Sequence, residues 1–348
     1  MSALPSSDGA KSVPQFDIFK VSDDPDAQVQ AMSEMMRPAA DFAGLGWSGS
    51  EGLEIVRMWL LDGVILTEMK MRAHVMLRRP IHLRKYPNDT VMVRHHLSGQ
   101  TSNEIGIDAY HAKPGDVHIT DLTELWSGVA TDAHFYGAAL AHTTIGYDPA
   151  RHPAHVPVVP PQSYDCEIAD IFRYLITDAV YGELEKANAV AVQFIDLLTG
   201  YLDCVEADPD EPHPKDLRKL QMRAFLEKSL SNPELSTELV AEAFGLSRAS
   251  VYRELSTLGG FDRYVQRRRL EEACKDLAFG DNTRGVIGEV AQRWQFSSVQ
   301  HFSREFKRHF GVSPSQTVAT WLFKLMPDDP HEMGKVTARG VPPWYAAI

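Results

Sequence analysis

The sequence predicts an α+β chain of two domains, a β-rich N-terminal domain followed by an all-α C-terminal domain. Three observations support this prediction. A length of 348 residues suits two domains that each bury a core of their own. Apolar residues alternate with a period of two over much of residues 52–142, as in half-buried strands. One short helical unit occurs twice, fifty positions apart, in the last third of the chain, which indicates a duplicated supersecondary unit.

The N-terminal region begins with residues 1–15, which we expect to be disordered, and a helix from Asp24 to Met36. Two apolar runs on either side of Asp62-Gly63, residues 55–61 and 64–67, are typical of a β-hairpin. Further short strands are expected at residues 90–97, 105–111, 117–120 and 135–143. Many short strands at this spacing favour an antiparallel barrel or a sandwich.

The connection between the domains is rich in proline. Residues 149–161 are predicted to be a connector, and residues 168–179 and 184–202 have the apolar stripes of amphipathic helices. These helices could pack on the barrel or form a dimer interface. Residues 206–214 are acidic with three prolines and are predicted to be a linker. The sequence therefore predicts domains at residues 16–205 and 215–325, with a non-periodic tail at residues 326–348.

The duplicated unit has the pattern of a helix-turn-helix, predicted at residues 236–257 and 286–309. VAEAFGLS at residues 240–247 recurs as VAQRWQFS at residues 290–297. Gly245 can adopt positive φ at the end of the first helix, and Ser247 can cap the second helix. In the second unit, Ser297 or Ser298 is the expected cap. The second helix of such a motif can enter the major groove of DNA.

A helix from Asp262 to Ala278, with Asp262 as its cap, is expected between the two units. At 1.5 Å per residue it is about 25 Å long, which suits two recognition helices in major grooves about 34 Å apart. Side chains left outside the apolar faces could contact bases or phosphates. The predicted DNA-binding residues are Ser247, Arg248, Ala249, Tyr252, Arg253, Arg267, Ser297, Ser298, Val299, Gln300, His301, Arg304 and Lys307.

These strings resemble the AraC/XylS family of transcription regulators. The strongest match is FSSVQHFSREFKRHFGVSPSQ, which begins at Phe296, and YVQRRRLEEA at residues 264–273 agrees with it. The resemblance implies binding to double-stranded promoter DNA, contact with RNA polymerase and a homodimer. It also implies that the N-terminal strands form a cupin-like antiparallel β-barrel that binds an effector. Two positions depart from the family pattern. Gln295 replaces the usual glycine of the second turn, and Gly259-Gly260-Phe261 lacks the usual Ser/Thr-Pro.

Charge is distributed unevenly along the chain. The formal net charge is −12, which alone would argue against a nucleic-acid partner. From Lys215 to Lys324, however, eighteen Lys and Arg residues outnumber thirteen Asp and Glu residues. A basic module attached to an acidic domain is typical of a regulated DNA-binding protein. Three scattered cysteines, with no stretch of about 18 apolar residues, favour a soluble cytoplasmic protein without membrane contact.

An enzyme is the competing interpretation, because cupin barrels often hold a metal. His95 and His96 are adjacent and would point to opposite faces of a strand, so they do not form a metal-binding pair. The sequence contains no Gly-rich phosphate loop, GxSxG or HExxH motif. We therefore predict no catalytic residues, no metal and no cofactor. Candidate effector-binding residues inside the barrel are Trp59, His96 and Tyr110.

The predicted function is that of a sequence-specific transcription regulator of the AraC type, an activator that responds to a small organic metabolite. Two alternatives stay open. The barrel could serve only for dimerisation in a regulator without an effector. Less favoured is a cupin-type metalloprotein fused to a DNA-binding module.

Overall fold

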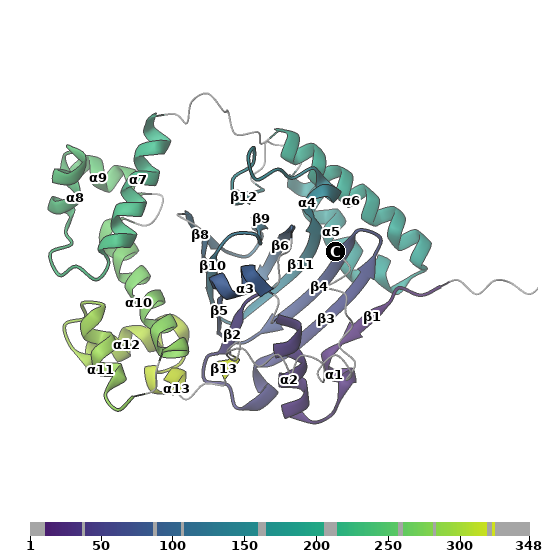
Figure 1. Ribbon diagram of the computed structural model, residues 1–348, viewed down its shortest axis with the longest axis horizontal. Helices are drawn as coiled ribbons and strands as arrows, with labels where there is room; N and C mark the ends of the chain where they lie inside the picture. The colour runs from purple at the N-terminus through teal and green to yellow at the C-terminus, as the bar shows by residue number, and fades with distance from the viewer. Residues whose placement is uncertain are drawn as a thin grey trace, which may run out of the picture.

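The computed structural model of the chain shows a β-rich N-terminal part beside a helical C-terminal part (Figure 1). Within the part of the chain that it describes, no helix combines the length and the apolar character needed to cross a membrane. The structure describes residues 11–36, 39–85, 89–105, 108–158, 165–204, 214–256, 260–280, 283–318 and 322–323.

Two antiparallel sheets form the N-terminal part. In the first, the strands lie in the order β1 (Gln15–Asp17), β3 (Leu53–Leu61), β4 (Val64–Met71), β11 (Ala133–Ala141), β6 (Thr90–Ser98), β9 (Val117–Asp121) and β12 (His155–Pro157). In the second, the order is β13 (Leu322–Phe323), β2 (Asp41–Gly44), β5 (His74–Leu77), β10 (Trp126–Ala130), β7 (Thr101–Ile105) and β8 (Asp108–Ala112).

The predicted hairpin shows how the local sequence positions these strands. Leu61 pairs with Val64 across the turn, and Gly63 has φ of 79°, a conformation that glycine adopts without a steric penalty. Because side chains alternate along a strand, Met58 and Trp59 point to opposite faces of β3. Met58 belongs to the core between the two sheets. Trp59 belongs to the core on the other face of the first sheet, which the helices at residues 165–177 and 184–204 cover.

The two sheets enclose a core that is rich in methionine. Met58 and Met92 come from the first sheet, and Phe42, Met76 and Trp126 come from the second. The outer face of the first sheet is covered by α5 (Asp165–Thr177) and α6 (Leu184–Cys204), both predicted. The predicted fold class, a cupin-like β-rich domain followed by an all-α domain, is confirmed. Shorter helical segments are α1 (Ile18–Val21), α2 (Pro25–Met36), η1 (Gly49–Gly52), α3 (Pro80–Lys85), α4 (His142–Ile145) and η2 (Ala179–Tyr181).

The C-terminal part contains the two predicted helix-turn-helix units, with α10 between them. Val240 and Val251 are buried in the core of the first unit. Phe302, Phe306 and Phe310 are buried in the core of the second unit, at the four-residue spacing that places them on one helical face. The helices are α7 (Pro214–Ser229), α8 (Thr237–Phe244), α9 (Arg248–Glu254), α10 (Phe261–Phe279), α11 (Val286–Arg293), α12 (Val299–Phe310) and α13 (Pro314–Val318).

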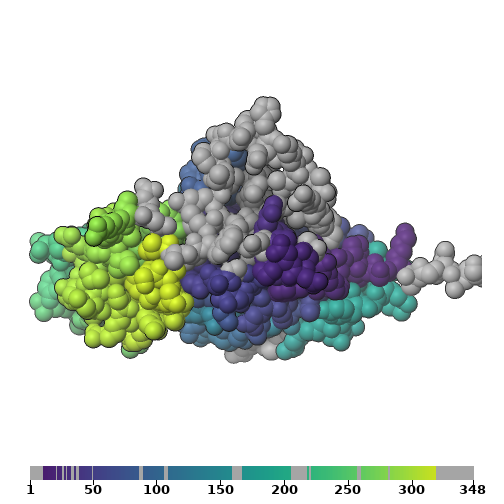
Figure 2. Space-filling model, turned by 90° about the horizontal axis from the view of Figure 1, so that it is seen from below, coloured from purple at the N-terminus to yellow at the C-terminus, as the bar shows by residue number. Residues whose placement is uncertain are grey.

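The second unit packs directly on the outer face of the second sheet. Ala43 and Val75 of that sheet share one core with Leu277 of α10 and Phe310 of α12. A seam between the C-terminal helices and the early strands is visible in the space-filling view (Figure 2). The two parts of the chain therefore share buried apolar surface as well as a covalent connection.

Several sequence predictions are wrong in detail. The predicted strand at residues 105–111 mainly corresponds to β8, whereas Ile105 is the last residue of β7 and pairs with Asp108 of β8. The predicted connector contains β12, which pairs with β9. Residues 11–15 are not disordered, because Ser12 bridges Glu183 and Val13 is buried. Of the predicted linker at residues 206–214, Pro214 is the first residue of α7. Residues 206–213 and the tail at residues 326–348 lie outside the described residues.

The spacer helix begins one residue earlier than predicted. Gly260, with φ of 87°, is its N-cap residue, and Asp262 lies within the first turn. Asp262 is therefore not the cap, although a carboxylate in the first turn still interacts favourably with the helix dipole. The glycine that departs from the family pattern thus supplies the backbone conformation that leads into α10.

Gln295 occupies the turn of the second unit with φ of 60°, the only positive φ of a non-glycine residue among the described residues. The left-handed conformation costs about 1–2 kcal/mol for a residue with a side chain. The Gln295 side chain offsets part of this cost, because its Nε2 donates a hydrogen bond to the Ser231 carbonyl at 2.8 Å. In the first unit, Gly245 makes the corresponding turn. In the second unit, Gln295 makes it, and its side chain is bonded to Ser231, which follows the end of α7.

Two substitutions separate these contributions. Gln295→Ala and Gln295→Gly both lose the hydrogen bond to Ser231, but only glycine relieves the backbone strain. We expect the glycine variant to be more stable than the alanine variant by about 1 kcal/mol, measured by denaturant unfolding. Equal stabilities would show that the turn carries no backbone strain.

Candidate nucleic-acid interface

The first helix-turn-helix unit presents one polar face to solvent. Ser247 caps α9, and its Oγ accepts a hydrogen bond from the backbone N–H of Ser250 at 3.1 Å. Burial of Val251 and Leu255 fixes the rotation of α9 about its axis. The predicted residues Arg248, Ala249, Tyr252 and Arg253 are therefore exposed, together with Ser247.

The second unit repeats this arrangement on α12. Ser298, one of the two predicted caps, accepts a hydrogen bond from the backbone N–H of His301 at 3.1 Å. Ser297 is not the cap, and its Oγ lies 3.2 Å from the Nδ1 atom of His301. The exposed residues of this unit are Ser297, Ser298, Val299, Gln300, Arg304 and Lys307, and His301 is half-buried.

The two units lie at opposite ends of α10 (Figure 1). Arg253 and Arg304 occupy equivalent repeat positions, and both are exposed. Tyr252 and Val299 are exposed apolar side chains on the same two helices. Arginine can bind guanine through two hydrogen bonds, and apolar groups can contact the methyl group of thymine. The arrangement thus offers two similar surfaces for reading a groove.

Two arginines on these surfaces make ion pairs through exposed side chains. Arg248 lies 2.6 Å from the exposed Glu238, and Arg304 Nε lies 3.6 Å from Glu305, which is buried and also pairs with Arg308. An exposed pair such as Arg248–Glu238 contributes about 0–1 kcal/mol, and Glu305 keeps Arg308 as a partner when Arg304 moves away. Exchanging them for phosphate or base contacts therefore costs little.

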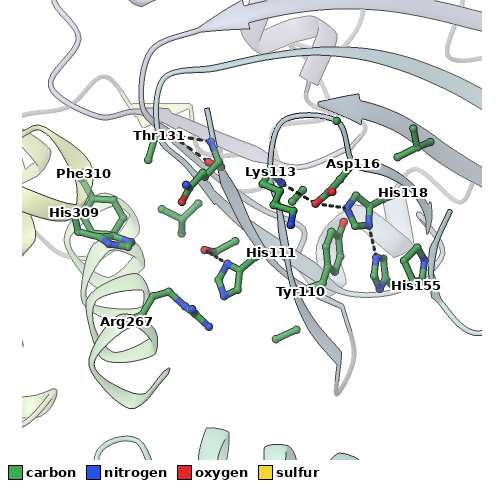
Figure 3. A pocket seen from close by; sticks show the side chains of 18 of the residues that line it. Tyr110, His111, Lys113, Asp116, His118, Thr131, His155, Arg267, His309 and Phe310 are labelled. Atoms are coloured by element: carbon green, nitrogen blue, oxygen red, sulfur yellow. Dashed lines mark hydrogen bonds and ion pairs between the residues drawn. The ribbon is translucent and has the colours of Figure 1, made fainter. Parts of the chain in front are cut away.

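Arg267 does not lie on either surface, which corrects its assignment as a phosphate contact. Its side chain is 19% exposed and lines a cleft between α10, α12 and the strands β8, β9 and β12 (Figure 3). Two residues that the sequence did not single out, Arg263 and Arg308, line the same cleft. Their spacing on different helices left no sequence signal that they share a site.

The candidate effector residues are separated in the structure. Trp59 packs against Tyr181 under the covering helices, so its assignment to the barrel interior is wrong. His96 lies between the sheets beside Phe135, and Tyr110 lines the interdomain cleft. A cavity in the barrel interior, lined by Met69, Met92 and Arg94 among others, has a volume of only about 20 Å³. The interdomain cleft has about 1040 Å³.

Histidines cluster next to the cleft. His118 Nδ1 lies 2.9 Å from His155 Nε2, and the Tyr110 ring stacks on His155 with centroids 3.6 Å apart. Burial lowers the pKa of His118 to about 4 and the pKa of His155 to about 3. Among the described residues, no group of three His, Cys, Asp or Glu side chains is placed to hold a metal ion.

Two fully buried histidines make stability depend on pH. Burial, together with the positive charge of the neighbouring Arg94, lowers the pKa of His74 to about 4 and the pKa of His96 to about 3. Both rings are neutral in the fold, but the unfolded chain binds protons as the pH falls below about 6.5. Their contribution is present above pH 6.5 and is lost as the pH falls toward 4.

As the pH is lowered from 6.5 to 5, we expect each of these histidines to decrease the free energy of unfolding by about 2 kcal/mol. The replacement His96→Phe, beside Phe135, removes one titrating group and should flatten this dependence. Thermal unfolding of both proteins at a series of pH values measures the difference. Identical slopes below pH 6.5 would mean that His96 does not titrate as a buried neutral ring.

Comparison with known proteins agrees with this geometry. A helix-turn-helix domain family model matches residues 240–320. The chain is 31% identical over 144 residues to the transcriptional activator RhrA of Rhizobium meliloti (strain 1021), a match that covers 41% of this chain and 45% of that protein. Identity is 36% over 101 residues to the HTH-type transcriptional activator RhaS of Salmonella schwarzengrund (strain CVM19633), covering 28% and 35%.

A further relative is matched over more of its own length. Identity is 31% over 97 residues to the HTH-type transcriptional activator AarP of Providencia stuartii, covering 27% of this chain and 69% of that protein. The chain thus spans less than half of RhrA and RhaS, but about two thirds of AarP. Among solved structures, the AraC-like transcriptional activator CuxR is similar with a TM-score of 0.48 and 18% identity, covering 76% of this chain and 96% of that one.

Proposed function

Because the chain belongs to the AraC/XylS family of transcription regulators, we propose that it binds a specific promoter site and activates transcription there in response to a small organic metabolite. The observation that carries the proposal is the pair of equivalent exposed arginines, Arg253 and Arg304, at the two ends of α10. Two such surfaces on one side of a duplex would each read one major groove. We infer a binding function and no catalysis.

The partners follow from the same proposal. Promoter binding by an activator implies contact with RNA polymerase. It also implies a cytoplasmic location, because the chromosome lies there. A homodimer is supported by apolar side chains that α5, η2 and α6 leave in solvent. Tyr174, Tyr181 and Val192 are each more than half exposed, and they lie on three elements that pack against one another, where an apolar patch would mark an interface. The α5 and α6 helices would then pack on the barrel and on the partner subunit.

Selection of bound sequences from a random DNA pool, with the full-length chain at defined salt, tests the proposal. We expect an enriched site with two sequence blocks about one helical turn apart. No enrichment, with or without added metabolite extract, would contradict the proposed function.

Arg304→Ala then tests the assignment of α12. We expect this variant to lose about 1–3 kcal/mol of binding free energy for the selected site and to relax the preference at one base position. Arg84→Ala is the matched control, because Arg84 is an exposed arginine of α3 in the β domain. Unchanged affinity and base preference in the Arg304 variant would show that α12 does not read the groove.

A further inference from the structure

The cleft between the two domains is the larger of the two cavities considered above, and residues from both domains line it. One wall is formed by α10 and the end of α12, with Arg263, Arg267 and Arg308. Arg263 and Arg267 are four residues apart on α10 and therefore share a helical face. The other wall comes from β8, β9 and β12 and includes Tyr110 and His155. Figure 3 shows Arg267 and His309 on one side, Tyr110, His118 and His155 on the other, and His111 between them.

The lining of this cleft is cationic, although the chain as a whole carries a formal net charge of −12. Its charged lining residues are Arg263, Arg267, Arg308 and Lys113 against a single carboxylate, Asp116. That carboxylate already accepts a hydrogen bond from the Lys113 backbone N–H and lies 3.8 Å from His118. The excess of positive charge is therefore not neutralised by Asp116.

Arg267 is the most informative of these side chains. Its Nε and Nη2 atoms are buried and have no hydrogen-bond partner among the described residues. Glu271 Oε1 lies 3.7 Å from Nε, beyond hydrogen-bonding distance, and the other oxygen of Glu271 is bonded to Arg268. Leaving buried charged donors without acceptors is costly. An acceptor supplied from the cleft would remove this cost.

The remaining polar groups suit the same acceptor. Arg308 is bound to Glu305, but its side chain is 71% exposed, so the contact is exchangeable. Lys113 is exposed on the turn between β8 and β9 and brings a cation from the opposite domain. Arginines can grip a carboxylate or a phosphate with two parallel hydrogen bonds. A volume of about 1040 Å³ admits a small organic molecule.

We propose that this cleft is a binding site for an organic anion, whose carboxylate or phosphate group is held by Arg267 and Arg308 from the DNA-binding domain and by Lys113 from the β domain. The inference rests on the proposed function and specifies its effector as an anion placed between the domains. Because the ligand touches both domains, its binding energy depends on their relative position. It is therefore coupled to the geometry of the two recognition helices.

Thermal unfolding and isothermal calorimetry of the full-length chain, with citrate and pyrophosphate as probes at constant ionic strength, test the proposal. Citrate represents carboxylate ligands and pyrophosphate represents phosphate ligands. We expect saturable binding of at least one probe with one site per chain, and stabilisation against heat. Arg267→Gln and Lys113→Gln should each weaken that binding by about tenfold or more. Lys113 is on an exposed turn, so this second variant tests the site without a buried substitution.

Two controls place the bound anion. Arg173→Gln removes an exposed arginine far from the cleft in sequence and should leave probe affinity unchanged. Arg304→Gln removes a cation of the proposed DNA surface, which could also attract polyanions, and should likewise leave it unchanged. Loss of probe binding in Arg304→Gln with retention in Arg267→Gln would overturn the cleft assignment, as would binding of neither probe to the unmodified chain.

DNA selection distinguishes this inference from the proposed function. If the chain selects a DNA site but binds neither citrate nor pyrophosphate in the cleft, the anion site is wrong and the regulator proposal stands. If no DNA site is selected while a probe binds in an Arg267-dependent way, the cleft stands as an anion site and the regulator proposal fails.

Discussion

Replacing Arg268 by methionine is expected to lower the free energy of unfolding by about 3–5 kcal/mol, because it leaves buried carboxylates without their cation. The Arg268 side chain is 3% exposed. It is bonded to Glu271 and Glu272 on its own helix, to Glu227 of α7 at 3.0 Å and to Glu104 of β7.

The burial of Glu271 explains why the loss should be large. Burial alone would raise the pKa of Glu271, but the Arg268 guanidinium opposes this effect and, with His111 and other neighbours, holds that pKa at about 2. Without Arg268, an ionised carboxylate that is 1% exposed would lose its principal counter-charge. The chain could respond by protonating Glu271 or by opening the interface between α10 and the second sheet.

Denaturant unfolding of Arg268→Met measures the loss, and Arg263→Met is its control. Arg263 is on the same helix and exposed, so its replacement should change stability by no more than about 0.5 kcal/mol. Adding Glu271→Gln to Arg268→Met should recover part of the stability, because the pair is then removed together. Equal stabilities of the Arg263 and Arg268 variants would show that the network contributes nothing to the interface.

Phe302→Ala is expected to lower the free energy of unfolding by about 3–5 kcal/mol. We expect the same variant to lose DNA binding. The Phe302 side chain is fully buried, with its ring centroid 4.9 Å from that of Phe296 and 5.4 Å from that of Phe306. Alanine would leave a cavity where α12 packs on α10, and the position of α12 depends on this contact. Unfolding in denaturant and binding to the selected DNA site measure the two effects.

Val299→Ala serves as the stability control on the same helix. Val299 is 41% exposed, so we expect a change of at most about 0.5 kcal/mol. If Phe302→Ala were as stable as Val299→Ala, the aromatic row of α12 would not hold the recognition helix in place.

The helical domain could be derived from the sequence because its signals are local. The fifty-residue repeat, the glycine at position 245 and the four-residue spacing of Phe302, Phe306 and Phe310 each act within one helix or one turn. Helix rotation follows from which side chains are buried, so the exposed faces of α9 and α12 follow as well. Arg267 was misplaced, because a run of three arginines does not reveal which of them a neighbouring domain covers, and Asp262 lies in the first turn of α10 rather than at its cap.

The β domain was predicted less completely because its order depends on distant pairing. The hairpin at Asp62-Gly63 and strands β6, β9 and β11 have clear alternation or turn signals. Strand β10 and strand β12 do not, and they are strands because β5, β7 and β9 supply their hydrogen-bond partners. A strand has no internal hydrogen bonds, so its partners decide whether it forms.

The sequence by itself determined the two helix-turn-helix units, the Ser247 cap and the family to which the chain belongs. Only the tertiary structure decided that Trp59 lies under α5 and α6, and that Arg263, Arg267 and Arg308 face Lys113 and His155 across one cleft. The physical reason is the range of the interactions. Capping and helical periodicity act over a few residues, whereas the cleft exists because buried apolar surface and the ions around Arg268 hold two distant segments together.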